Sequence, residues 1–187
     1  HQPPNTSRVV PAALDLRPLL PPVRDQGDTS TCAAQTAACM KEYQERVDCG
    51  AAAHMSPQFV YNFRANRPES GMHGRDVMEI LRHRGIAPEA AFPFGGTDAE
   101  PAAAELLAAA QQFRIAEYAQ VTTAAGLKEA LVRSGPCYIS FPVFNFGPRF
   151  YLPEGEQRQR GGHAVAVVGY DARGFILRNS WADWGDG

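Results

Sequence analysis

The sequence predicts an α+β protein with two lobes, the first mainly helical and the second mainly strand. Segments of strong helix formers with recognisable starts and stops fill much of the first half, whereas β-branched and aromatic segments gather toward the end. With 187 residues, the chain can bury a core without help from metals or disulfides. We expect one domain over 1–187, helical over about 14–95 and β over about 96–187, with the ligand site in a cleft between the lobes.

A proline-rich strap precedes the first helix. Prolines oppose helix over residues 9–28, so we expect an extended, irregular segment on the surface. From Cys32 to about Arg46 the sequence CAAQTAACMKEYQER contains helix formers and no Gly or Pro, and Ser30 or Thr31 is available as N-cap. Cys32 is therefore expected in the first turn of a helix.

Four further helices and four strands are expected. The helices are predicted over 56–64, 76–84, 100–112 and about 123–134. Ser56 before Pro57 marks the start of the first of these helices, and Gly85 marks the end of the second. Thr122 or Thr123 caps the start of the last one, and Gly135 ends it. The strands are predicted over 113–121, 137–141, 163–170 and 174–179. The first of these strands rests on the alternation in FRIAEYAQV, and a turn at 171–174 joins the last two.

Composition excludes several classes of partner. The chain has 18 Lys and Arg against 20 Asp and Glu, a formal net charge of -2, so it lacks the basic footprint of a nucleic-acid or anionic-membrane binder. No apolar run approaches the ~20 residues that a spanning helix requires, and the first ten residues lack the pattern of a secretory signal. We expect a soluble protein with no membrane span, and the sequence leaves its compartment open.

The cysteines and histidines do not form a structural framework. The four cysteines are Cys32, Cys39, Cys49 and Cys137. If one of them is kept free for chemistry, three remain, so we expect no essential disulfide. The histidines at 54, 73 and 83 are not spaced as zinc ligands, so no metal site is expected.

One set of residues is suited to nucleophilic catalysis. A thiol attacks as thiolate, and a helix N-terminus together with a neighbouring imidazolium lowers its pKa, which makes Cys32 the candidate nucleophile. His163 in GGHAVAVVGY is held on a strand behind two glycines and can act as acid and base. Asn179 in RNSW follows on the next β-segment, where its amide oxygen can orient the imidazole.

These motifs resemble those of the papain-like cysteine peptidases, the papain and cathepsin superfamily, with the look of a divergent, prokaryotic-type member. VRDQG resembles the family's Gln-Gly element, GHAVAVVGY its histidine strand and RNSWADWG its Asn-Ser-Trp motif. His163 and Asn179 follow Cys32 by 131 (163 − 32) and 147 (179 − 32) positions, within the ~130 to 150 typical of this arrangement. The resemblance covers about 14–185 and is weak over 95–159.

The resemblance implies a fold, a reaction and further site residues. It implies a papain-like two-lobe fold whose second lobe is an antiparallel sheet or barrel, and hydrolysis of peptide bonds without a cofactor or metal. The Gln26 side chain and the Cys32 backbone amide would both donate hydrogen bonds to the oxyanion. Trp181 would cover the hydrogen bond between His163 and Asn179. The positions expected to border bound substrate are Gly71, Gly74, Ser140, Gly161, Gly162 and Trp181. The resemblance also implies a peptide or protein substrate and a monomer, and allows for an inhibitory N-terminal pro-segment.

The sequence departs from the family pattern in several places. TSTCAAQ stands where C-G-S-C-W-A-F is usual, so Thr29 replaces a cysteine that usually forms a disulfide and Ala33 replaces an aromatic residue beside the nucleophile. Gly162 stands where the family often has Asp or Asn, and WADWG is one residue shorter than usual. The chain stops at Gly187, so the β lobe is expected to be cut short.

Two other functions fit the same residues. A Cys-His-Asn site also serves a thiol acyltransferase or deamidase, because each begins with a thioester. The altered cysteine motif motivates a third hypothesis, a binding protein that keeps the scaffold without catalysis. For the peptidase, the apolar character of 140–144, 71–74 and 161–162 indicates a hydrophobic residue before the scissile bond.

Overall fold

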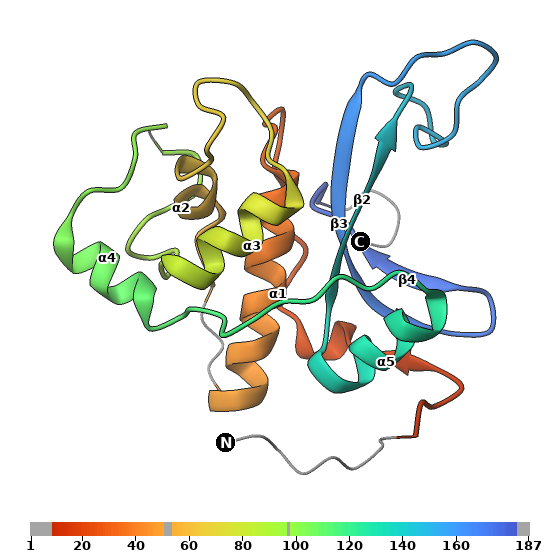
Figure 1. Cartoon of the computed structure of the whole chain (residues 1–187), viewed down its shortest axis with the longest axis horizontal. Coiled ribbons are helices and arrows are strands. Elements are labelled where there is room, and N and C mark those ends of the chain that lie inside the picture. The colour runs from red at the N-terminus through yellow and green to blue at the C-terminus, as the bar shows by residue number, and fades with distance from the viewer. Residues whose placement is uncertain (1–8, 51–53, 97, 183–187) are drawn as a thin grey trace.

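The computed structural model describes residues 9–50, 54–96 and 98–182, and has most of its helices on one side and the sheet, with one helix packed against it, on the other (Figure 1). The predicted α+β class is confirmed, and the helices and antiparallel sheet have the two-lobe arrangement of the papain fold. The end of the β lobe that was expected to be cut short, at 183–187, lies outside the described residues.

The helices begin and end close to where their caps predict. They are α1 (Cys32–Cys49), α2 (Pro57–Asn62), α3 (Gly74–His83), α4 (Ala104–Gln111) and α5 (Ala124–Ser134). Helix α1 runs three residues past its predicted end because the left-handed residue that stops it is Gly50, whose N–H bonds to the carbonyl of Arg46 at 3.1 Å. At α2 the predicted cap is confirmed, since the Ser56 hydroxyl accepts from the Phe59 N–H at 3.0 Å. None of the described helices is long and apolar enough to cross a membrane.

The sheet is built around one long strand. Strand β3 (Gly161–Tyr170) pairs antiparallel with β2 (Cys137–Val143), β4 (Phe175–Arg178) and the short β1 (Leu14–Asp15). Val167 faces Cys137 on one side and Leu177 on the other, so β2 and β4 flank β3 on opposite edges. The predicted irregular strap, 9–28, contains β1 and a 3-10 turn over Arg17–Leu19 and is otherwise irregular, as expected.

The strand predicted over 113–121 is wrong. This segment is irregular and crosses from α4 to α5 in front of α1 (Figure 1). Phe113 and Ile115 pack against the helical core, and the Ile115 N–H bonds to the carbonyl of Leu81 at the end of α3. The apolar positions therefore do not form one buried face, since Phe113 and Ile115 pack on helices whereas Tyr118 and Val121 are exposed.

Small residues on α1 bring the two lobes together. Alanines at 33, 34, 37 and 38 are buried, and they join one core cluster with residues of α2, α3 and Ala164 of β3. Because these side chains are single methyl groups, strand and helices can both approach the α1 backbone closely. The N-terminus of α1 is thereby held against the start of β3, at the upper edge of the view in Figure 1.

Candidate active site

Cys32 is the first residue of α1 and is partly buried. Burial raises the pKa of its thiol, while hydrogen bonds from the backbone amides of Ala164, Ala33 and Cys32 itself act in the opposite direction. The amide of Ala164 belongs to the residue after His163. The thiol therefore lies against β3 at the residue that follows the predicted acid/base, among backbone donors suited to a thiolate.

His163 is held in one orientation by Asn179. Its Nε2 lies 2.7 Å from Asn179 Oδ1, which also accepts the Ser180 N–H at 2.9 Å. An oxygen that accepts from Ser180 accepts from the imidazole too, so Nε2 carries the proton in the neutral ring and Nδ1 is the free base. Burial lowers the pKa of His163, and the Asn179 hydrogen bond partly offsets this by favouring the imidazolium.

Aromatic rings enclose the imidazole, which is only 5% exposed. Trp181 stacks on His163 with ring centroids 4.5 Å apart and an interplanar angle of 27°. Phe141, opposite His163 on β2, and Phe150 approach it edge-on at 5.8 and 5.9 Å. Sequence reasoning missed Phe150 because it lies in the long β2–β3 connection, where no motif marks it.

Gln26 is fixed at the other side of the site by the Asn-Ser-Trp segment. It is 6% exposed, its Nε2 donates to Thr29 O at 2.7 Å, and its Oε1 accepts from Ser180 Oγ at 2.7 Å. Its backbone N–H bonds to Ser180 O at 2.8 Å, and Asp25 forms a β-bridge with Trp181. The orientation of the Gln26 amide is thus coupled to the segment that carries the histidine's partner. Ser180, which sequence reasoning passed over, is marked only by its place in the RNSW motif.

Hydrogen bonds of Thr29 hold the turn before α1. The Thr29 hydroxyl donates to Gln26 O at 2.6 Å and lies 2.7 Å from Thr31 Oγ1. Thr31 occupies the N-cap position, but its side chain does not cap the helix. The hydroxyl of Thr29 therefore connects the Gln26 turn to the residue before α1.

A tyrosine from β2 packs against the helical core and over Gly74. Tyr138 joins the core cluster that contains Ala33, and its ring lies over Gly74. A Cβ at Gly74 would come within 2.7 Å of the ring, so a larger residue there would displace it. Burial, with a smaller effect from Cys32, raises the pKa of Tyr138, which keeps the phenol neutral.

The positions expected to border substrate fall in two places. Ser140 is exposed opposite Ala164, and Gly161 and Gly162 are exposed at the start of β3, so these three lie beside His163. Gly74 starts α3, whereas Gly71 lies in the preceding turn, where its carbonyl accepts from the Asn66 side chain at 3.3 Å.

The other three cysteines differ from Cys32 in position or in environment. Burial raises the pKa of Cys39 to about 12 and that of Cys137 to about 11, so both are neutral thiols at neutral pH. Cys49 is exposed at the end of α1. Within the described ranges, no three His, Cys, Asp or Glu residues gather as a metal site.

The comparisons with known proteins agree with this geometry. The family pattern described as "Papain family cysteine protease" matches residues 10–187. The chain is 32% identical to cathepsin K of Gallus gallus over 98% of its length and 59% of the relative's, and it spans about three fifths of the curated relatives it matches.

Two solved structures show the same fold. Xylellain, a cysteine protease from Xylella fastidiosa, matches 91% of this chain and 75% of its own with a TM-score of 0.77 and 30% identity. Digestive procathepsin L 3 of Tenebrio molitor, at 19% identity, covers 94% of this chain and 62% of its own with a TM-score of 0.71, and supports the fold alone. From its sequence pattern and its fold, the chain belongs to the papain family of cysteine proteases.

Proposed function

We propose that this chain hydrolyses peptide bonds with Cys32 as nucleophile and His163 as acid and base. The observation that carries the proposal is the 2.7 Å contact between His163 Nε2 and Asn179 Oδ1, because it directs the free Nδ1 away from the amide. The Cys32 thiol, which lies against the amide following His163, is the group suited to exchange a proton with that nitrogen.

The proposed reaction runs through a thioester. The thiol proton passes to His163, and the Cys32 sulfur attacks the peptide carbonyl. The resulting tetrahedral oxyanion accepts from the Cys32 amide and from Gln26 Nε2. When the C–N bond breaks, the imidazolium gives its proton to the leaving nitrogen and a thioester remains. His163 then removes a proton from water, and the water oxygen attacks the thioester carbonyl. The C–S bond breaks, the carboxylic acid leaves, and the imidazolium returns its proton to the Cys32 sulfur.

Replacement of Gln26 by alanine is expected to lower kcat for amide hydrolysis by about 10²- to 10³-fold, since one oxyanion donor is lost. Alkylation of Cys32 by iodoacetamide forms no oxyanion, so its rate should change little. Both rates are measured on the same preparation, beside Gln111→Ala on the exposed end of α4. An equal fall in both rates would show instead that the variant has disturbed the nucleophile.

Replacement of Asn179 by alanine should move the alkaline limb of the kcat/KM profile to lower pH. The Asn179 hydrogen bond raises the pKa of His163, so its loss lowers that pKa further. The imidazolium, which must protonate the leaving nitrogen, is then lost earlier as pH rises. The profile is measured between about pH 4 and 10. An unchanged alkaline limb would contradict the orienting role given to Asn179.

The function itself is tested with a library of peptidyl aminocoumarin amides that varies the residue before the scissile bond. We expect hydrolysis that iodoacetamide abolishes, with a hydrophobic residue preferred at that position. Strict preference for a charged residue would remove the specificity proposal alone. Transfer of the acyl group to an added amine without hydrolysis would favour an acyltransferase, and cleavage of nothing in the library would contradict the proposal.

A further inference from the structure

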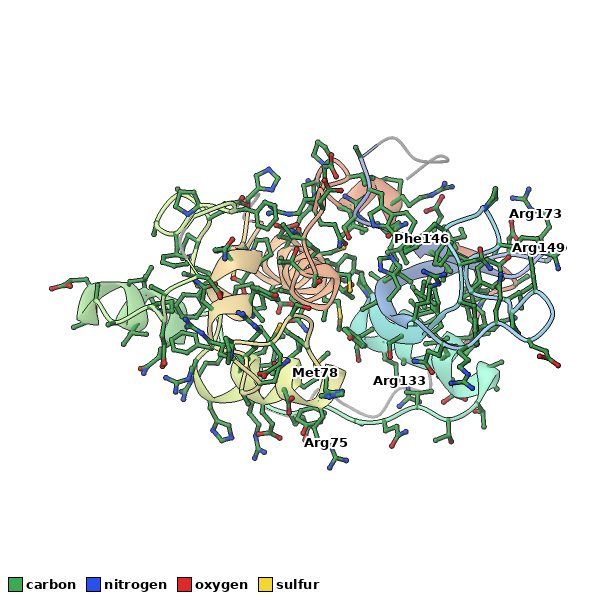
Figure 2. The ribbon with its side chains drawn as sticks, turned by 90° about the horizontal axis from the view of Figure 1, so that it is seen from above. Arg75, Met78, Arg133, Phe146, Arg149 and Arg173 are labelled. Carbon is green, nitrogen blue, oxygen red and sulfur yellow. The ribbon has the colours of Figure 1, made fainter. Side chains whose placement is uncertain are left out.

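A small cavity lies between α1 and the segment that carries Asn179. Its volume is about 10 Å³, and its walls include Arg24 of the strap, residues 178–180, and Gln35, Thr36 and Glu42 of α1. Figure 2 views α1 almost end-on, between α2 and the sheet, so the cavity lies where helical and β elements meet. We call it the interlobe cavity.

Two polar atoms in the wall of the interlobe cavity are buried and have no hydrogen-bond partner among the described residues. They are Nε of Arg24 and Oε1 of Gln35. Gln35 is only 2% exposed, and it takes the place of the phenylalanine in the usual C-G-S-C-W-A-F pattern, so an amide lies where an apolar ring is usual. A buried donor or acceptor that is left unpaired destabilises the fold, so both atoms require a partner.

The guanidinium of Arg24 cannot turn to find a partner for Nε elsewhere. Its Nη2 donates to Glu42 Oε1 at 2.5 Å and to Met55 O at 2.9 Å, and its Nη1 donates to Glu89. Because the guanidinium is planar and both Nη atoms are held, the direction of the Nε–H is fixed. The partner of Nε therefore has to come from within the cavity that Arg24 lines.

The amide of Gln35 is held in one orientation by two threonines before α1. The Thr29 hydroxyl donates to Gln26 O at 2.6 Å, so the Thr31 hydroxyl, whose oxygen lies 2.7 Å from Thr29 Oγ1, donates to Thr29. Thr31 Oγ1 then accepts from Gln35 Nε2 at 3.4 Å. This chain of hydrogen bonds places the NH2 group of Gln35 toward Thr31 and leaves Oε1 as the acceptor in the cavity wall.

The chemistry of the two atoms defines the ligand. It has to accept a hydrogen bond from Arg24 Nε, which excludes a metal cation, and donate one to Gln35 Oε1, which excludes a halide anion. A single water molecule meets both conditions and fits the volume of the cavity. Its second hydrogen has an acceptor in the hydroxyl of Thr36, which lines the same cavity and gives its own proton to Cys32 O at 2.9 Å.

We infer that this chain binds one internal water molecule between Arg24 Nε and Gln35 Oε1. The water connects the strap to the helix that begins at Cys32. The strap is in turn joined to the Asn-Ser-Trp segment, because Arg24 O accepts the Ala182 N–H at 3.0 Å. The water is therefore one of the connections between the helix of Cys32 and the segment of Asn179, whichever reaction the site performs.

A crystal structure of the wild-type chain at near-atomic resolution tests the inference directly. We expect one electron-density peak about 2.7 to 3.2 Å from both Arg24 Nε and Gln35 Oε1. A cavity without a peak, or side chains repacked so that Arg24 bonds to Gln35 directly, would overturn the inference. So would an anomalous signal at the same place after soaking in bromide, because it would assign the peak to an anion.

A solution measurement on variants identifies the same water without a crystal. Oxygen-17 magnetic relaxation dispersion counts the water molecules that stay inside a protein for longer than the protein takes to tumble. Gln35→Met should lower this count by one, since methionine has nearly the shape of glutamine but no strong acceptor.

Gln58→Met is the matched control for Gln35→Met. Gln58 is also a buried helical glutamine, but its amide bonds directly to Asn62 Oδ1 at 2.8 Å and to the Gly95 N–H at 3.1 Å, so its replacement should not lower the count. An unchanged count in Gln35→Met, or an equal fall in the control, would contradict the inference. Hydrolysis by the wild-type chain decides the proposed function separately.

Discussion

Replacing Cys32 by alanine is expected to lower peptide hydrolysis by roughly 10⁴-fold or more. The thioester cannot form without the sulfur, and the rest of the site can only bind the substrate and polarise its carbonyl. The loss should appear in kcat, with KM for a peptidyl aminocoumarin amide changed much less, because the alanine removes a reacting atom and little binding surface.

Cys49→Ala is the matched control for this variant. Cys49 is the exposed cysteine at the other end of the same helix, so its loss should leave kcat and KM at the wild-type values. Residual hydrolysis in Cys32→Ala that approached the wild-type rate, with the control unaffected, would show that another group is the nucleophile.

Replacing His163 by alanine is expected to have a comparably large effect, again about 10⁴-fold in kcat. Burial raises the pKa of the Cys32 thiol, so without the imidazole the thiol stays protonated at neutral pH. The leaving nitrogen would also lack its proton donor. Raising the pH restores the Cys32 thiolate but not the acid that protonates the leaving nitrogen. The variant should therefore regain alkylation by iodoacetamide at high pH without regaining hydrolysis.

The two residues should act as one unit. The double variant Cys32→Ala/His163→Ala is expected to be no slower than the slower single variant, because each single change already disables the same step. Multiplied losses in the double variant would show that Cys32 and His163 contribute independently, which is incompatible with a thiol and imidazole that exchange one proton.

The parts of the fold that were predictable have local causes. The start of α1 at Cys32 and the cap at Ser56 each depend on residues within a turn of the boundary, and the sequence contains that information. Cys32, His163 and Asn179 were predicted as site residues for a related reason, since each lies in a motif whose residue types and spacing suit thiol chemistry. The structure brings the second and third into hydrogen-bond contact.

What could not be predicted depends on contacts between distant segments. The alternation at 113–121 indicated a strand, but the helical core decides which of its apolar residues are buried, and Phe113 and Ile115 pack there while Tyr118 and Val121 stay exposed. Similarly, the packing of Tyr138 against the helical core and over Gly74 joins elements that no local pattern relates. Phe150 reaches His163 only because its connection folds back over the site.

The most direct test of the central claim is the reaction of the four cysteines of the native wild-type chain with substoichiometric iodoacetamide near pH 6.5, followed by peptide mapping. At this pH an ordinary thiol is almost wholly protonated, and Cys39 and Cys137 are more so, since burial raises their pKa values. The account predicts that Cys32 is modified first and almost alone, despite being less exposed than Cys49. Modification of Cys49 ahead of Cys32 would contradict the account, because it would show that His163 does not activate the Cys32 thiol.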